Sequence, residues 1–452
     1  MTVGCPVTGS DRITDRPGEA DAPALERTVD EQGRATWHVR SLALVREILR
    51  RSGEVHQSGF GSEAVRQSMP LTRWPVLWAD GDEHRAQRTK VARYFAPTVV
   101  DTRYRELIEA RADAFLARLD AGEAVDMSEL TLHFSAQVAA QVIGLTDSDQ
   151  EAMARRLVGF FDQPAAVLEP GASGWRRLLS LPAALPGSLE LLRFHLKDVR
   201  PALKARRGEA REDVLSHLIA EGYSELEIVM ECVTYAAAGM VTTRECLQVC
   251  AWHLLTDEDL RTRFLGADSA GRRRILHELL RLEPVVGHLL RRAVVDVRLM
   301  TEEGEVTIPA GDRLDLYIRG ANADPAIGDD GKRLCPERTM PSGVRAEVMS
   351  FGDGPHRCPG NTIAMIETEV LLERLLRRDV ELVGEPRIEW EDLIAGYAVR
   401  GLVLRQRGAR LGWRCRARRT RPGPSRPLKE GTHRADQGQG LRRHRRRKRH
   451  RT

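Results

Sequence analysis

Apolar residues recur with helical spacing over most of this chain. Between positions 41 and 51, for example, Leu42, Val45, Ile48 and Leu49 fall on one helical face. Patterns of this kind predict helices over 41–51, 82–95, 100–118, 128–144, 147–162, 191–220, 257–265, 270–282 and 361–377. Strand-like stretches are short and occur within 290–318, 380–383 and 397–404. The pattern therefore predicts a mainly α protein with small β-sheets, without internal repeats.

The longest helical pattern runs from Ser224 to Leu255 and contains no proline and only one glycine, Gly239. About 30 residues in α-helix make a rod of roughly 45 Å. We expect this segment to cross the whole fold as a central helix. By contrast, 163–190 is broken by four prolines and several glycines, and together with the loop at 60–80 it is expected to cover a substrate.

Composition narrows the class of protein. No stretch approaches the ~18 consecutive apolar residues of a membrane-spanning helix, and the polar first 40 residues resemble neither a signal peptide nor an anchor. The seven cysteines are odd in number and lack a CxxC pair, which favours a reducing compartment over a disulfide framework. The pair Cys246 and Cys250, one turn apart, is interpreted as two small buried thiols rather than half a metal site. These features predict a cytoplasmic protein without a membrane partner.

Charge is distributed unevenly along the chain. Residues 406–452 hold 18 Lys and Arg against 2 Asp and Glu, whereas residues 1–405 hold 52 against 63, so a net charge of +5 conceals an acidic body with a basic tail. We expect a flexible leader over 1–35, one domain over 36–405 and a disordered tail over 406–452. The tail is interpreted as a non-functional extension, with binding to nucleic acid or an anionic surface as the alternative.

Cys358 stands in the segment FGDGPHRCPG, residues 351–360. The glycines permit tight turns, and backbone N–H groups in such a turn are able to point at the sulfur and set its basicity. A lone cysteine between such turns and an apolar helix suits a single metal thiolate.

Three further motifs precede this loop. Glu278 and Arg281 stand at i,i+3, where a carboxylate and a guanidinium meet on a helix. The segment AGMVTT, residues 238–243, lies in the expected central helix. His84 and Arg88 stand at i,i+4 in DGDEHRAQR, residues 80–88, so they form a cationic clamp on one face.

These four motifs, in this order, closely resemble those of the cytochrome P450 superfamily. Every fixed position of its Phe-Gly-x-Gly-x-His/Arg-x-Cys-x-Gly loop is filled, and Asp80, Glu83, His84, Arg88, Phe95 and Pro97 match the helix that reads Asp-x-x-Glu-His-x-x-x-Arg and ends in Phe-x-Pro. The resemblance covers about residues 35–405. It implies one large domain with haem held between the long central helix and the helix that follows the cysteine loop.

The resemblance also implies roles for single residues. Cys358 would be the axial ligand of the iron in haem b, the bound metal, and would favour O–O cleavage. The haem propionates would be bound by His84, Arg88, Arg291 and His356, although Arg292 leaves the assignment of Arg291 ambiguous by one position. A structural lock would consist of Glu278, Arg281 and a third partner, Arg338. Val285 and Val286, together with Ala237, Ala238 and Val241, would line the substrate pocket.

Within the central helix, Thr242 would hydrogen-bond to dioxygen, and Gly239 would let the backbone approach the flat cofactor at a helix distortion. Without the resemblance, Gly-x-x-Thr is more simply explained by helix packing. The chain departs from the family at Val241, because relatives usually carry Asp or Glu immediately before the threonine. A carboxylate there relays protons, so its absence places the usual proton path in doubt.

The resulting hypothesis is a soluble bacterial haem-thiolate monooxygenase, an oxidoreductase of secondary metabolism. It would take electrons from NAD(P)H through a reductase and a ferredoxin or flavodoxin, and oxidise a small apolar or secondary-metabolite-like molecule. One alternative is oxidative coupling of aromatic or cyclic-peptide substrates, or peroxide-driven turnover, which depend less on the proton relay. Another is a non-catalytic haem-binding sensor; a nucleic-acid-binding role finds support only in the tail.

Overall fold

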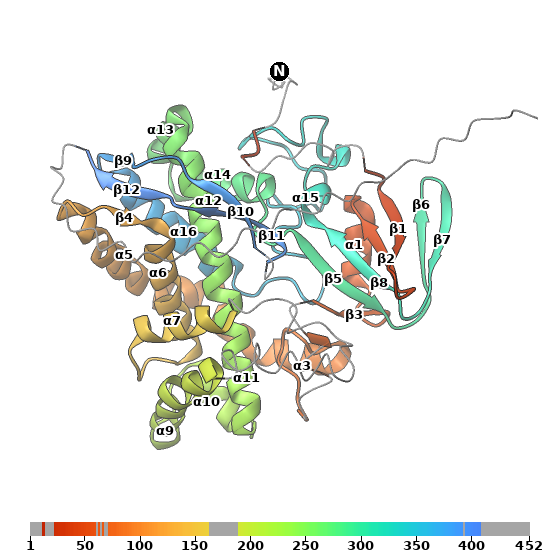
Figure 1. Cartoon of the computed structure of the whole chain (residues 1–452), viewed down its shortest axis with the longest axis horizontal. Helices are drawn as coiled ribbons and strands as arrows, with labels where there is room; N and C mark the ends of the chain where they lie inside the picture. The colour runs from red at the N-terminus through yellow and green to blue at the C-terminus, as the bar shows by residue number, and fades with distance from the viewer. Residues whose placement is uncertain are drawn as a thin grey trace, which may run out of the picture. The chain divides into compact units, whose positions relative to one another are not determined.

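Helices account for most of the folded chain in the computed structural model (Figure 1), which describes residues 11–13, 22–59, 62, 63, 66, 71–161, 189–391 and 394–407. The observed helices agree closely with those predicted from the spacing of apolar residues. The main helices are α1 (Leu42–Arg50), α3 (Gly81–Val91), α5 (Arg105–Asp120), α6 (Met127–Ile143), α7 (Gln150–Phe161), α9 (Arg200–Gly208), α10 (Val214–Ala220), α13 (Glu258–Gly266), α14 (Ser269–Leu282) and α16 (Asn361–Leu376). Short helices include α4 (Pro97–Val99), α15 (Ile318–Ala321), the 3₁₀ turns Ala92–Phe95 and Pro325–Ile327, and the π turns Val100–Tyr104 and His195–Val199.

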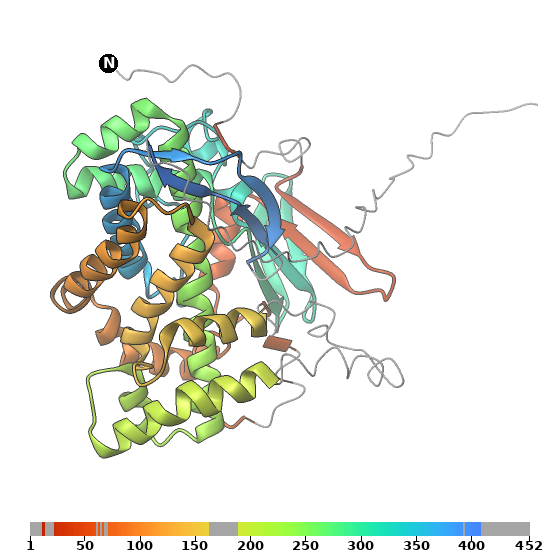
Figure 2. The same cartoon turned by 60° about the vertical axis from the view of Figure 1, so that its left-hand side comes forward.

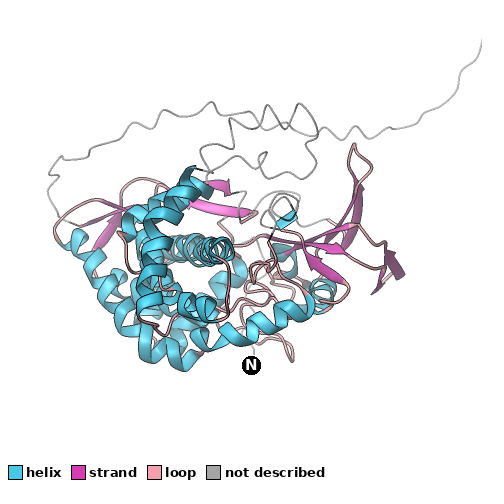
Figure 3. Cartoon of the chain, turned by 90° about the horizontal axis from the view of Figure 1, so that it is seen from below, coloured by secondary structure: helices cyan, strands magenta, loops and turns pink. Residues whose placement is uncertain are grey.

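The predicted central helix is confirmed and runs without a break from Glu225 to Thr256 (Figure 3 shows it end-on among the other helices). It consists of α11 (Glu225–Ala236), a π-helical turn η5 (Ala237–Val241) and α12 (Thr242–Thr256). Ser224 and Glu227 form a reciprocal capping box at its start. It is long and apolar enough to cross a membrane, but 72% of its most apolar window is buried inside the fold, as in the core helix of a globular protein.

The strands form small sheets. The largest has the order β1 (Leu25–Val29), β2 (Ala35–Val39), β8 (Arg313–Tyr317), β5 (His288–Ala293) and β3 (Val55–Gln57), with only β2 and β8 parallel. Figure 2 shows this sheet beside the helices rather than among them. The others are the β6–β7 hairpin (Val297–Thr301, Gly304–Ile308), the β10–β11 pair (Arg387–Glu391, Gly396–Arg400) and β4–β12–β9 (Val125–Asp126, Val403–Gln406, Val380–Leu382).

Part of the predicted leader is ordered. β1 lies wholly within residues 1–35, and Arg12 is buried, where it donates hydrogen bonds to the carbonyls of Leu282 and Arg319. Asp11 accepts a hydrogen bond from the backbone of Leu334. The predicted tail lies outside the described residues from position 408 onwards, as does the proline-rich segment over 162–188.

Buried apolar side chains of the described residues fall into three clusters. The first lies among α5, α6, α12, α14 and α16, the second among α6, α7, α9, α10 and α11, and the third between α1 and the five-stranded sheet. Because α6 and the central helix contribute to both helical clusters, they join the two halves of the helical part.

A fully buried ion pair connects α14 to the irregular segment before the cysteine loop. Arg281 is 0% exposed and binds Glu278 through two parallel hydrogen bonds of 2.7 and 2.8 Å. Its guanidinium also donates to three backbone carbonyls, those of Asn322 (2.8 Å), Gly331 (2.6 Å) and Arg333 (3.0 Å). The five donors of one arginine are thus used to fix a loop that has little secondary structure.

Arg338 lies where the resemblance placed a third partner. Its Nε is 3.4 Å from Glu278 Oε1, and its guanidinium also binds the side chain and carbonyl of Asp330. Glu278 accepts a further hydrogen bond from the backbone N–H of Cys335 at 2.9 Å.

We expect Arg281→Lys to lower the free energy of unfolding by about 3–5 kcal/mol, because an ammonium cannot replace the planar fork and leaves buried carbonyls without donors. Arg377→Lys is the control, since Arg377 is paired with Glu373 on α16 at an exposed site and should change stability by less than about 1 kcal/mol. Denaturant titration measures both. Equal effects of the two substitutions would contradict the structural lock.

Candidate active site around Cys358

The cysteine loop is folded tightly and anchored to α1. Gly352 and Gly354 adopt positive φ angles of 69° and 65°, and a Cβ on Gly354 would lie 2.2 Å from the carbonyl oxygen of Leu49. The Cys358 N–H donates to the Phe351 carbonyl at 2.9 Å, which closes the turn. Only glycine fits at position 354, so the predicted need for glycine in this loop has a specific steric cause there.

The Cys358 sulfur lies at the start of α16. Burial raises the pKa of its thiol, whereas backbone N–H groups of Gly360 and Asn361 and the nearby guanidiniums of Arg88 and Arg357 lower it. N–H groups at a helix start stabilise negative charge on sulfur, and a metal ion in place of the proton would do the same. Among the described residues, no group of three or more His, Cys, Asp and Glu side chains is placed to hold a metal ion.

Four predicted cationic residues gather beside this loop. His84 and His356 stack with ring centroids 3.8 Å apart, and Arg88 reaches from α3 to the Arg357 carbonyl at 2.6 Å. Arg291 extends from β5 and is 4% exposed. The structure therefore brings together residues from positions 84 to 358. It also resolves the one-position ambiguity, because Arg291 is the buried residue of the two and Arg292 pairs with Glu63.

The electrostatics of this cluster fit an anionic ligand. Burial, together with the charges of His356 and Arg88, lowers the pKa of His84 to about 3, and burial lowers that of Arg291 to about 10. Asp80, 3.4 Å from His356 Nε2, is the carboxylate that acts on this group. A desolvated guanidinium and two imidazoles with lowered pKa values share one carboxylate, and the two carboxylates of a haem would supply the negative charge that favours the protonated forms of all three. The buried indole N–H of Trp78, in the loop before α3, also lacks a hydrogen-bond partner.

The central helix exposes one short segment near its middle. Ala238 is exposed and Ala237 and Thr242 are half-buried, although the residues before and after them are buried. The Thr242 hydroxyl donates to the Ala238 carbonyl at 2.6 Å across the π-helical turn. The predicted helix distortion is present. We call Ala237, Ala238 and Thr242 the open segment.

Two residues within this stretch of the helix, Gly239 and Val241, pack against the rest of the fold. A Cβ on Gly239 would lie 3.3 Å from the Cβ of Ala139 on α6, so this glycine accounts for close helix packing. Val241 is 4% exposed. The packing interpretation of Gly-x-x-Thr therefore explains Gly239 in this structure, and its approach to a cofactor stays a prediction.

The predicted pocket residues Val285 and Val286 are half-buried in the link between α14 and β5. The adjacent Gly287 is clamped against the loop before β11, where an added Cβ would lie 2.2 Å from the Ala395 carbonyl oxygen. The position of the two valines is thus fixed by backbone contacts on their C-terminal side.

The sequence motifs did not predict two buried acidic residues. Burial raises the pKa of Glu231, on α11, to about 8, and that of Glu367, on α16, well above its usual range. The charge of Cys246 acts on Glu367, and one oxygen of each carboxyl lacks a hydrogen-bond partner. In the sequence each appears only as a single acid inside an apolar helical run. Such an acid does not by itself indicate a buried site, because the sequence does not show what packs against it.

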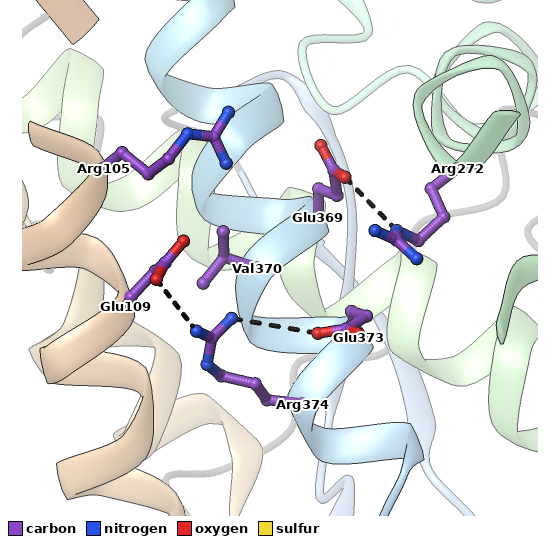
Figure 4. Close-up of a pocket in the computed structure, with 7 residues that line it drawn as sticks. All are labelled: Arg105, Glu109, Arg272, Glu369, Val370, Glu373 and Arg374. Atoms are coloured by element: carbon purple, nitrogen blue, oxygen red, sulfur yellow. Dashed lines mark hydrogen bonds and ion pairs between the residues drawn. The ribbon is translucent and has the colours of Figure 1, made fainter. Parts of the chain in front are cut away.

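A separate pocket lies between α5, α14 and α16 (Figure 4) and is lined by Arg105, Glu109, Arg272, Glu369, Val370, Glu373 and Arg374. Its charges are paired: Arg272 binds Glu369, and Arg374 binds both Glu109 and Glu373. It shares no residue with the Cys358 cluster.

Comparison with known proteins agrees with this geometry. Residues 273–385 match the family described as Cytochrome P450. The chain is 27% identical over 391 residues to the erythromycin C-12 hydroxylase of Saccharopolyspora erythraea, covering 81% of this chain and 90% of that protein. It is 28% identical to Cytochrome P450 130 of Mycobacterium tuberculosis, covering 70% and 74%. The crystal structure of CYP108D1 from Novosphingobium aromaticivorans superposes with a TM-score of 0.69 at 23% identity, covering 86% and 92%.

The family match and the curated relatives define the class as a haem-containing oxidoreductase. The chain belongs to the cytochrome P450 superfamily. It is a monooxygenase with haem b as cofactor and NAD(P)H as the source of electrons through redox partners.

We expect Arg291→Gln to release haem at least about tenfold faster than the parent protein, because a charge-assisted hydrogen bond to a carboxylate contributes about 1.5–3 kcal/mol. Transfer of haem to excess apomyoglobin measures the rate. Arg292→Gln is the control, since that side chain pairs with Glu63 on the other side of the strand. Similar rates for both variants would exclude Arg291 as a propionate ligand.

Proposed function

We propose that this monooxygenase inserts one oxygen atom into a small apolar or secondary-metabolite-like molecule, with electrons from a ferredoxin or flavodoxin in the cytoplasm. The observation that carries this proposal is the position of Arg88, which donates a hydrogen bond to the Arg357 carbonyl beside Cys358 and lies near Tyr235 of the central helix. This position supports a site that includes both the thiol and the nearby open segment. The hydroxylase of Saccharopolyspora erythraea acts, by its name, on erythromycin, which supports a secondary metabolite as the substrate class.

Bound haem would supply the iron at which dioxygen is activated, with Cys358 as its thiolate ligand. The chain's own residues contribute the rest. N–H groups of Gly360 and Asn361 hold negative charge on the sulfur, and His84, Arg88, Arg291 and His356 would hold the propionates. The Thr242 hydroxyl donates its hydrogen to the Ala238 carbonyl, so its oxygen is left to act as a hydrogen-bond acceptor.

Electron delivery would occur at the surface beside the cysteine loop. Arg46, Arg50 and Arg345 all contact Asp353 in that loop, and three guanidiniums share this one carboxylate. The guanidiniums of Arg50 and Arg345 are about half exposed, at 52% and 46%. The surplus of positive charge suits an acidic ferredoxin, which the acidic body as a whole would otherwise repel.

Val241 favours a second candidate, oxidative coupling or peroxide-driven turnover. The next acid along this helix, Glu245, is buried, and its carboxyl group is engaged by Arg244 and Arg400, so it does not take the place of the missing acid beside Thr242. A site with little proton supply at Thr242 suits reactions that need fewer protons.

Turnover under ¹⁸O₂ tests the proposal, with a substrate identified by its shift of the ferric optical spectrum. We expect one ¹⁸O atom in the product. We also expect Val241→Asp to raise the fraction of consumed NAD(P)H recovered as product, because it restores a proton donor beside Thr242. Val241→Asn is the matched control of equal size and should not do so. A product without ¹⁸O, formed equally well by both variants, would establish the second candidate instead.

A further inference from the structure

Glu231 is a buried carboxyl on the central helix that the proposed mechanism does not use. Its side chain is 2% exposed as part of α11, and one oxygen, Oε1, accepts a hydrogen bond from the Val76 backbone N–H at 3.0 Å. The other oxygen, Oε2, is inaccessible to solvent and has no hydrogen-bond partner. An unpaired buried oxygen is costly, typically about 1–3 kcal/mol, so it calls for an explanation.

A role in supporting the loop that contains Val76 does not explain the unpaired oxygen of Glu231. Glu227, one turn earlier on the same helix, also supports that loop, and both of its oxygens are satisfied: Oε1 accepts from the Arg73 N–H at 2.9 Å, and Oε2 accepts from the Ser224 N–H at the helix start at 2.8 Å. These hydrogen bonds keep the pKa of Glu227 below its usual value despite partial burial. Two carboxylates one turn apart thus hold the same loop, but only Glu227 is satisfied.

Glu231 also lacks a countercharge. Burial raises its pKa to about 8, and the opposing influence is the single N–H of Val76, with no cation acting on it. Its titratable neighbours Tyr223 and Tyr235 are neutral at physiological pH, and burial raises the pKa of both phenols. A buried carboxyl in this state gains more from an incoming cation than a solvated one does, because water does not compete for it.

The position of Glu231 connects it to the open segment. Glu231, Tyr235 and Ala238 follow each other at i, i+4 and i+7, which places them on one side of the helix. Tyr235 is half-buried and stacks on Phe95, and its hydroxyl makes no hydrogen bond within the described part of the chain. Ala238 is exposed and bonded through its carbonyl to Thr242. This stripe therefore extends from an unsatisfied acid to the predicted oxygen-activating residue.

We propose that Glu231, assisted by the Tyr235 hydroxyl, is a cation subsite that binds a protonated amine of the substrate. The Glu231 carboxyl releases its proton to water as the ammonium group binds. The amine N–H then donates to Oε2 in an ion pair, and Oε1 still accepts from the Val76 N–H. The inference rests on the proposed function in one respect, namely that Thr242 marks the place of oxidation.

The spacing sets the shape of such a substrate. Thr242 lies eleven positions after Glu231, which corresponds to on the order of 16 Å along a helix axis. The amine would therefore be distant from the oxidised carbon, and the substrate would be an elongated or polycyclic molecule with a basic group at one end and an apolar body at the other.

Three probes with one hydrocarbon frame test the subsite on the haem-loaded protein: N,N-dimethyl-4-phenylbutylamine, 4-phenylbutanol and butylbenzene. Dissociation constants come from calorimetry, because these probes are shorter than the distance from Glu231 to Thr242 and need not change the haem spectrum. We expect the amine to bind at least about tenfold more tightly than butylbenzene and the alcohol to fall between them, because a charged hydrogen bond is stronger than a neutral one.

Glu231→Gln is the decisive variant because its amide oxygen is still able to accept from Val76 while the acid is lost. It should abolish the preference for the amine and leave butylbenzene unchanged. Glu227→Gln is the matched control and should keep the preference. An unchanged preference in Glu231→Gln, equal weakening of all three probes, or no saturable binding of the amine to the parent protein would overturn the proposal.

Difference infrared spectroscopy gives a readout that a structural role would not affect. Addition of the amine should convert a protonated carboxylic acid band into a carboxylate band, and this conversion should be absent in Glu231→Gln and present in Glu227→Gln. No conversion in the parent protein would contradict an ion pair at Glu231. Loss of the subsite with normal ¹⁸O insertion would leave the proposed function intact, so the two failures are distinguishable.

Discussion

The buried ion pair between Glu278 and Arg281 is the interaction on which the rest of the site depends. The segment over 319–360 has little regular structure of its own, yet it must place a cysteine in a fixed position. Arg281 holds three of its carbonyls, and Asn322 returns a hydrogen bond to the Arg281 carbonyl at 3.1 Å. Asn322 also accepts from the Met349 N–H, and the Ser350 hydroxyl binds the Leu280 carbonyl. Through these bonds α14 determines where the cysteine loop begins.

The site is built from ionisable groups whose charged forms the fold alone does not stabilise. His84, Arg291 and His356 are desolvated beside Asp80, and Cys358 is a half-buried thiol beside backbone N–H groups. Each of these groups is unfavourable without a partner and favourable with an anionic, metal-containing one. Cofactor binding should therefore stabilise the folded state, since a ligand that binds only the native protein shifts the unfolding equilibrium.

Much of this architecture is predictable from the sequence because it depends on local patterns. The central helix follows from apolar periodicity without proline, and the cysteine loop follows from glycines at positions that need positive φ, such as Gly354. The pairing of Glu278 with Arg281 follows from i,i+3 spacing. The sequence does not predict that Arg281 also binds backbone carbonyls of an irregular loop. Every residue has a carbonyl, so the residue types do not show which carbonyls accept these hydrogen bonds.

Features that depend on distant contacts were not predictable. β1 lies in a polar segment that resembled a leader, since only its pairing with β2 makes it a strand. Gly239 packs against Ala139, a residue one hundred positions earlier. Glu231 belongs to none of the sequence motifs, and its significance depends on the loop that covers it. The sequence shows that Val241 departs from the acid usual in the family. It does not show that Glu245 pairs with Arg400, which lies far away along the chain.

The central claim is that Cys358 is the thiolate ligand of haem in this chain. The most direct test is the optical spectrum of the reduced holoprotein under carbon monoxide, for the parent and for Cys358→Ser. We expect the parent to show the long-wavelength Soret band of a thiolate-bound haem and the variant to lose that band. A parent spectrum of the kind given by histidine-bound haem, or a thiolate band that persists in Cys358→Ser, would contradict the assignment.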